Sequence, residues 1–129
     1  MSKQIIHTDA APAAVGPYSQ AVSAPASSQV VFLSGQIGLE PGTGELVSDN
    51  FEPQARQAFA NMKAVIEAAG ATFADVVKLT LYLTDLSNFA AVNAIMSDLL
   101  PQPFPARSTV EVSGLPKGAQ FEVEAILAL

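Results

Sequence analysis

Residues 76–85, VVKLTLYLTD, alternate between apolar and polar side chains, and this alternation limits the possible fold more than any other stretch. The apolar positions are Val77, Leu79, Leu81 and Leu83, and the polar positions are Lys78, Thr80, Tyr82 and Thr84. Successive side chains of a β-strand point to opposite faces, so the stretch predicts a strand with one core face and one polar face. The polar face must meet water or a second copy of the chain, which makes a symmetric oligomer with clefts between subunits plausible.

Two amphipathic helices are expected to cover the apolar face. The first begins near Pro53, with Asp49 or Asn50 available as its N-cap and Gly70 as its end. Its apolar positions recur every three or four residues, at Ala55, Phe59, Met62, Ile66 and Ala69.

The second helix is predicted to follow Ser87, a natural N-cap residue, and to stop at Pro101. Its apolar positions are Phe89, Val92, Ile95, Met96 and Leu99. Further strands are predicted at 18–22, 29–33, 108–112 and 120–129. Two helices on one face of a mainly antiparallel or mixed sheet define an α+β fold, and 129 residues without an internal repeat or linker predict a single domain, 1–129.

Composition excludes several classes of function. The net charge of −6 repels phosphate backbones and anionic lipid, so neither nucleic acid nor a membrane is expected as a partner. The absence of cysteine removes disulfides and thiolate metal sites, and the single histidine, His7, offers no partner for a catalytic triad or a metal cluster. No metal site is predicted. Without a signal-peptide core or an apolar stretch of bilayer length, the chain is expected to be soluble and cytoplasmic.

Arg107 and the acidic strand near the C-terminus are the candidate residues for binding or catalysis. The arginine fork suits bidentate binding of a carboxylate and keeps its charge in a partly dry pocket. If residues 108–112 and 120–129 pair as an antiparallel hairpin, with Thr109 opposite Glu122, then Arg107 shares a face with Glu122 and Glu124. A cross-strand ion pair of little energetic value would give the same pattern, and spacing alone favours that simpler reading.

Six motifs, taken together, favour a functional role for Arg107 over the simple ion pair. They are GPYSQAV at 16–22, SGQIG at 34–38, AAG at 68–70 followed by VVK at 76–78, FAAVN at 89–93, FPARS at 104–108, and LPKGAQFEVEA at 115–125. In this order and spacing the chain resembles the Rid family, also known as the YjgF family, of reactive-intermediate imine deaminases, in its arginine-containing type. The resemblance covers essentially the whole chain.

The resemblance implies a chorismate-mutase-like, ferredoxin-like α+β fold and a homotrimer with sites between subunits. It implies hydrolysis of 2-imino acids or their enamine tautomers, such as 2-aminoacrylate, 2-iminopropanoate and 2-iminobutanoate, to 2-keto acids and ammonia, without a cofactor. Arg107 is similar to the arginine that grips the substrate carboxylate, and Glu122 to the glutamate that positions the attacking water. Further pocket positions carried by the resemblance are Tyr18, Ser34, Gly35, Lys78, Asn93 and Thr109.

Two departures from the family bear on substrate preference. Thr109 stands where many members have cysteine, a change that is tolerated if the position acts through its backbone N–H. The segment between the second helix and Arg107 is shorter than in typical members, which reshapes the rim of the pocket.

Other functions stay open at this stage. A binding module that senses 2-keto or imino acids would keep Arg107 without turnover, and loss of Glu122 would separate the two cases. A ribonuclease or translation inhibitor is disfavoured by the charge. A chaperone-like role through exposed apolar surface would persist in an Arg107→Ala variant.

Overall fold

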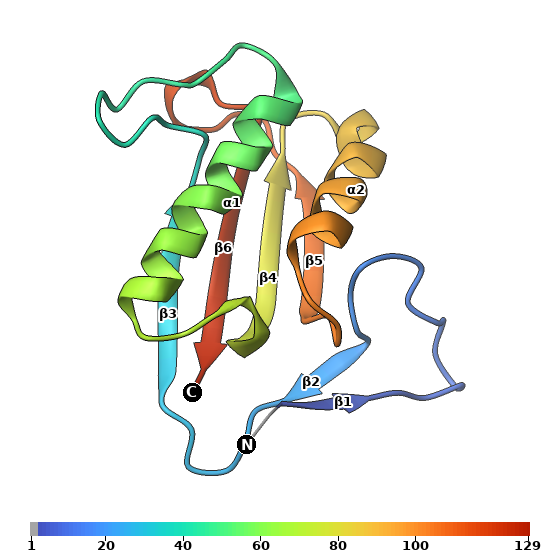
Figure 1. The fold of residues 1–129 in the computed structure, drawn as a ribbon. Coiled ribbons are helices and arrows are strands. Elements are labelled where there is room, and N and C mark those ends of the chain that lie inside the picture. Colours follow the sequence, from blue (N-terminus) through green and yellow to red (C-terminus); the bar gives the residue numbers. More distant parts are fainter. Residues whose placement is uncertain (1–2) are drawn as a thin grey trace.

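The computed structural model describes residues 3–129, in which a four-stranded mixed sheet carries two helices on one face (Figure 1). The sheet order is β3-β6-β4-β5, with bounds Val30–Gln36, Phe121–Ala128, Val76–Leu83 and Ala106–Glu111. The helices are α1, Phe51–Ala68, and α2, Phe89–Leu99. Short 3₁₀ turns occupy Phe73–Asp75, Leu86–Asn88 and Pro116–Gly118. This α+β architecture is the predicted one.

The core lies between the sheet and the helices, and β4 runs through its centre. Leu79, Leu81 and Leu83 are fully buried, as their alternation predicts. The prediction for Val77 is wrong: Val76 is fully buried in its place and Val77 is half-buried. The ladder with β6 shifts register between Val76 and Lys78, and one extra residue reverses the direction of every side chain before it.

Both helices form where the periodicity predicts them, although their ends differ in detail. Asn50 precedes α1 without a side-chain capping bond, and Gly70 follows it with a φ of 78°, the left-handed conformation that glycine adopts without strain. Ser87 is not the N-cap of α2. The Asp85 side chain instead accepts from the Ser87 N–H at the start of the preceding 3₁₀ turn, so the helix begins two residues later, at Phe89.

The predicted hairpin between the last two strands does not form. β5 pairs with β4 in parallel, and β6 pairs antiparallel with both β4 and β3, so β4 separates β5 from β6. The hairpin prediction assumed that strands adjacent in sequence are neighbours in the sheet. Here the parallel β4–α2–β5 crossover takes the edge position, and β6 is inserted in the middle of the sheet.

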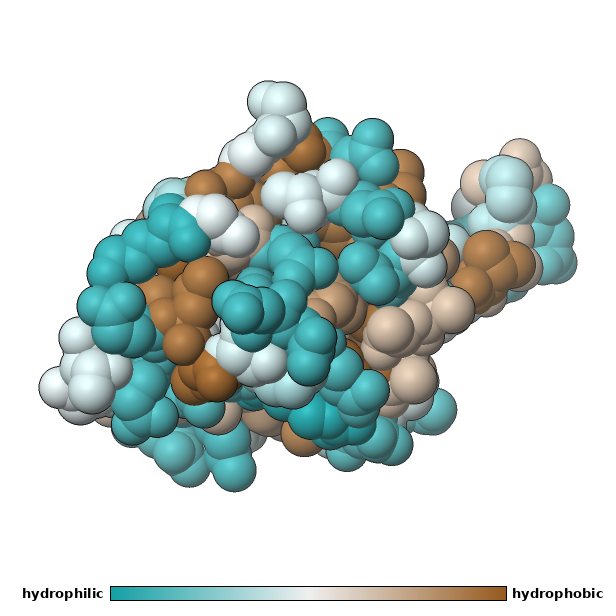
Figure 2. All heavy atoms as spheres, turned by 90° about the horizontal axis from the view of Figure 1, so that it is seen from above, coloured by the Kyte–Doolittle hydropathy of each residue, from teal (hydrophilic) through white to brown (hydrophobic). Residues whose placement is uncertain are grey.

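The N-terminal region forms a second, two-stranded sheet from β1, Gln4–Ile6, and β2, Ala21–Ser23. The strand predicted at 18–22 therefore starts later, and Ser19 forms an isolated parallel bridge to Ala106, the first residue of β5. The loop that joins β1 and β2 projects from the body of the molecule (Figures 1 and 2). It brings the N-terminal segment beside β5.

The face of the sheet opposite the helices is open. Besides its polar row it carries Phe32, which is 76% exposed, with Val30 and Val110 also exposed. Exposed apolar side chains on an uncovered sheet face are typical of a surface that meets another protein.

Candidate active site

Arg107 lies on the helix-covered side of the sheet. It stands in register with the buried Leu79 on β4, and its side chain is held from α2. Nη1 donates to Asn93 Oδ1 at 2.7 Å and contacts Met96 Sδ at 3.5 Å. The guanidinium also lies over two aromatic rings, 4.8 Å from the centroid of Tyr18 and 5.3 Å from that of Phe89. These contacts hold the fork in one orientation.

A cavity of about 230 Å³ opens in front of this arginine. Its walls are Val15, Tyr18, Phe89, Arg107 and Thr109. Burial lowers the pKa of the Arg107 guanidinium, partly offset by Tyr18, yet an arginine keeps its proton in such a setting. The cavity therefore presents a fixed positive fork between aromatic walls to a small anion.

The projecting loop supplies one wall of this cavity. Its base is organised by Gln20, whose amide bonds the backbone of Thr8 in both directions and also donates to Pro12 O. At its far end the Val15 N–H donates to the Tyr18 hydroxyl at 3.3 Å. A Cβ added at Gly16 would lie 3.5 Å from Arg107 Nη2, so the loop backbone passes directly over the arginine.

Sequence reasoning missed two lining residues, Val15 and Phe89. Phe89 was assigned to the apolar face of α2, but it is 37% exposed and its ring faces Arg107. Its spacing of four residues from Asn93 puts both on one side of the helix, a signal that could have identified it. Val15 carries no such signal, because only the path of the loop brings it to the cavity.

Glu122 lies on the open side of the sheet. It stands in register with Tyr82 on β4, and next to it β3 makes a bulge between Leu33 and Gln36. Ser34 and Gly35 occupy this bulge and are exposed. A Cβ at Gly35 would lie 2.3 Å from Glu122 Oε2, so the carboxylate rests directly on the glycine. Burial first, and the charge of Glu124 second, raise the pKa of Glu122.

Lys78 and Thr109 are the two remaining residues of the predicted site. Lys78 is on the open face, and its Nζ donates to Ser108 Oγ at 3.0 Å. Thr109 lines the Arg107 cavity, and within residues 3–129 its buried Oγ1 has no hydrogen-bond partner.

The predicted residues thus form two groups on opposite faces. Arg107, Tyr18, Asn93 and Thr109 lie on the helix side, and Glu122, Ser34, Gly35 and Lys78 lie on the open side. The expectation that Arg107 and Glu122 share a face is wrong for one subunit. Leu79 and Tyr82, their neighbours on β4, are three residues apart and so point in opposite directions.

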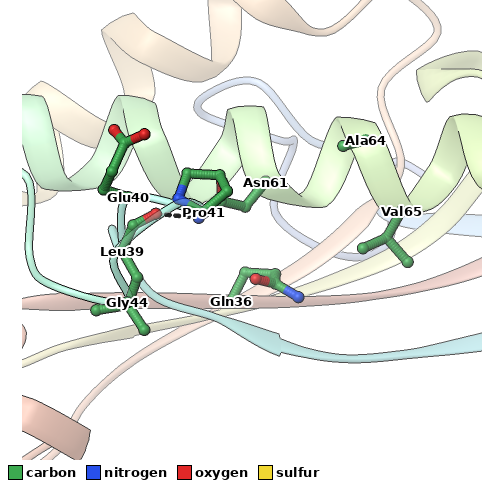
Figure 3. Close-up of a pocket in the computed structure, with 8 residues that line it drawn as sticks. All are labelled: Gln36, Leu39, Glu40, Pro41, Gly44, Asn61, Ala64 and Val65. Carbon is green, nitrogen blue, oxygen red and sulfur yellow. Dashed lines mark hydrogen bonds between the residues drawn. The ribbon is translucent and has the colours of Figure 1, made fainter.

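A larger cavity, of about 350 Å³, lies elsewhere, between α1 and the end of β3 (Figure 3). Its lining includes Gln36, Leu39, Glu40, Asn61 and Val65, and Asn61 Nδ2 donates to Leu39 O across it at 2.9 Å. None of the predicted site residues lines it. Its side chains offer no fixed cation, so we assign the chemistry to the smaller cavity.

The described part of the chain holds no group of three or more side chains suited to a metal ion. Nor does any helix within residues 3–129 combine the length and the apolar character needed to cross a bilayer.

Comparison with known proteins gives the family. The family model described as Endoribonuclease L-PSP matches residues 8–129. The 2-iminobutanoate/2-iminopropanoate deaminase of Dermatophagoides farinae is 47% identical over 127 residues, which cover 98% of this chain and 97% of the relative. The chain belongs to the Rid family. The Arabidopsis thaliana protein named Reactive Intermediate Deaminase A, chloroplastic, is 46% identical to this Rid protein over 129 residues, covering 100% of the chain and 67% of the relative.

The fold of this Rid protein agrees with a solved member. The crystal structure of RidA from the Antarctic bacterium Psychrobacter is 49% identical, covers 98% of this chain and 99% of its own, and superposes with a TM-score of 0.76. The predicted family and the two-helix α+β fold are therefore confirmed.

Proposed function

We propose that the protein hydrolyses 2-imino acids, such as 2-iminobutanoate and 2-iminopropanoate, to 2-keto acids and ammonia. The observation that carries the proposal is the Arg107 fork, held by Asn93 between two aromatic rings at the end of a cavity of about 230 Å³. Relatives of nearly full-length similarity are named for this activity.

The chemistry needs few groups. Arg107 binds the substrate carboxylate, which fixes the electrophilic C2 carbon at one place. Glu122 accepts a proton from water as the water oxygen bonds to C2, and it returns that proton to nitrogen. This gives a carbinolamine with OH and NH2 on C2. Its hydroxyl proton then moves to the nitrogen as the C–N bond breaks, which releases ammonia and leaves the C=O group of the keto acid. No cofactor enters the balance.

Glu122 of one subunit does not face its own Arg107, so the proposed site is shared between subunits. The open sheet face supports this arrangement, because Phe32, Val30 and Val110 are exposed there in the single chain. We propose a closed homotrimer in which Arg107 of one subunit meets Glu122 of the next, with the chorismate-mutase-like domain extending over residues 1–129. A cytoplasmic location stays a prediction; one relative is named chloroplastic.

A second candidate is a sensor of 2-keto or imino acids without turnover. The hold on Arg107 by Asn93 and the lining of its cavity both come from one subunit, and this favours a sensor, since binding of a carboxylate does not require Glu122. The family description names an endoribonuclease, but a net charge of −6 opposes binding to RNA.

One assay separates these functions. A threonine dehydratase generates 2-iminobutanoate in place, semicarbazide competes for it, and keto-acid formation is followed with wild-type, Arg107→Ala and Glu122→Gln protein. Faster keto-acid formation with the wild type alone supports the deaminase. Binding of 2-ketobutyrate by calorimetry without any acceleration supports the sensor, and failure of both readouts rejects both functions.

A further inference from the structure

The open sheet face holds a second carboxylate that the proposed reaction does not use. Glu124 follows Glu122 by two residues on β6, so both side chains leave the same face of the sheet. Tyr82 on β4 stands directly opposite Glu122 in the ladder, whereas Thr80 stands opposite Glu124. The Tyr82 hydroxyl nevertheless donates to Glu124 Oε1, at 2.7 Å. Tyr82 therefore reaches diagonally past its own neighbour to hold the other carboxylate.

Within the part of the chain that the structure describes, the negative charges of Glu122 and Glu124 are not matched by nearby positive charges. On this face, among the described residues of β3, β4, β5 and β6, Lys78 is the one cation. Its Nζ donates to Ser108 on β5, on the side of β4 away from β6. β3 contributes only Ser34 and Gly35 next to Glu122, and β5 contributes Ser108 and Val110, none of which titrates in this range. The groups that face Glu122 are therefore Tyr82, Glu124 and the distant Lys78.

We propose that Glu124, held by Tyr82, is a positioning residue that acts on the hydrolysis through Glu122. The inference rests on the proposed function. The bond from Tyr82 to Oε1 holds the Glu124 carboxylate toward β4, so its negative charge stays beside the carboxylate that must accept a proton from water. Because the Tyr82 hydroxyl donates its hydrogen bond to Glu124, the Glu122 oxygens stay available for water.

Glu124 is proposed to act by raising the proton affinity of the Glu122 carboxylate. A nearby like charge favours the protonated form of a carboxyl group, and the charge of Glu124 raises the pKa of Glu122 in this way, after burial. The bond from Tyr82 to Glu124 in turn raises the pKa of the tyrosine, which keeps it protonated as the donor. A base whose pKa lies closer to the working pH accepts and returns a proton more efficiently.

The test follows the titration of the Glu122 carboxyl carbon by ¹³C NMR in the assembled protein, with its signal assigned by its loss in Glu122→Gln. In Glu124→Gln the midpoint should move to lower pH, because the neighbouring charge is gone. Glu124→Asp restores the charge and should bring the midpoint back toward the wild type. Tyr82→Phe should move it in the same direction as Glu124→Gln, by less. Glu67→Gln, which removes an exposed charge from α1 on the other side of the sheet, should leave it unchanged.

The kinetic arm measures kcat/KM against pH, with hydrolysis of the free imine subtracted at each pH. The acid limb should move to lower pH in Glu124→Gln, in step with the NMR midpoint. An unchanged midpoint in Glu124→Gln, or a moved midpoint with an unchanged acid limb, overturns the proposal. An inactive wild type would reject the deaminase itself, a result that the NMR titration distinguishes from failure of the coupling between the two carboxylates.

Discussion

Gly35 and Glu122 are in direct contact: a Cβ on the glycine would lie 2.3 Å from Oε2 and 2.8 Å from Cδ of the glutamate. Gly35→Ala should therefore push the carboxylate aside while leaving the fold intact, since the far end of a side chain can move. Misplacing a reacting group by about 1 Å is expected to lower kcat/KM on the order of 10- to 100-fold. Steady-state kinetics beside a thermal melt will measure both effects.

A matched control for this substitution is Gly114→Ala. An added Cβ there meets nothing within 4 Å, so activity and stability should match the wild type. Full activity in Gly35→Ala would mean that Glu122 tolerates displacement and does not direct the water.

Asn93 orients Arg107 by accepting from its Nη1 at 2.7 Å. Asn93→Ala removes a hydrogen bond to a charged group, and we expect about 10-fold weaker binding of 2-ketobutyrate, in line with roughly 1.5 kcal/mol for such a bond. Calorimetric titration will measure the dissociation constant. Ser97→Ala, at an exposed position of the same helix, serves as the control, and equal affinity in the two variants would contradict the positioning role of Asn93.

Opposite placement of Arg107 and Glu122 predicts complementation between two inactive variants. If Arg107→Ala and Glu122→Gln chains are co-expressed, each mixed ring of the proposed trimer would contain one site built from the intact Arg107 of one subunit and the intact Glu122 of its neighbour. Random assembly at equal amounts should restore about a quarter of the wild-type sites. Activity of the whole purified pool of co-expressed protein, without sorting of its trimers, is the measurement. Activity no higher than in the separate variants would show that sites are not shared in this way.

The raised pKa of Glu122 also predicts a pH dependence of stability. The folded carboxyl holds its proton to higher pH than the unfolded one, so the unfolded state binds fewer protons in the interval between the two pKa values and stability falls as pH rises through it. Glu122→Gln removes this loss. The variant should melt above the wild type at neutral pH and together with it below the unfolded pKa, at one fixed protein concentration because assembly contributes. The opposite order at neutral pH would contradict the burial of this charge.

Gly38 is required by packing. A Cβ there would lie 2.4 Å from the carbonyl oxygen and 2.7 Å from Cα of Gln54, both backbone atoms of α1 that cannot move alone. The buried Gln54 side chain also ties the helix to Ser48 O and to the Gln120 N–H. Gly38→Ala should lower the free energy of unfolding by about 1–3 kcal/mol in urea titration. Gly42→Ala, whose Cβ meets only Glu40 Oε1 at 4.0 Å, should have no measurable effect, and an equally stable Gly38→Ala would refute the clash.

Local patterns predicted much of this molecule. The alternation in β4 identified its buried leucines, the three- and four-residue spacing located both helices, and Gly70 marked the end of α1. These features depend on interactions within a few residues, which the sequence displays directly. The motifs around Arg107 and Glu122 identified the family because they recur in order along the whole chain.

Strand order and side-chain direction followed from longer-range packing. The bulge at Val76 and Val77 changed which valine is buried, and β4 lies between β5 and β6, the two strands that were expected to pair. Phe89 and Val15 became cavity walls only when α2 and the N-terminal loop met over Arg107.

The sequence by itself determined the family and the place of both helices and most strands, and it led us to propose Arg107 and Glu122 as the cation and the carboxylate of the site. Each of these inferences depends on residue type and local spacing. Only the tertiary structure decided that Arg107 and Glu122 face opposite sides of one sheet. That outcome depends on which strands become neighbours and in what register, and a shift of one residue in register reverses the face to which a side chain points.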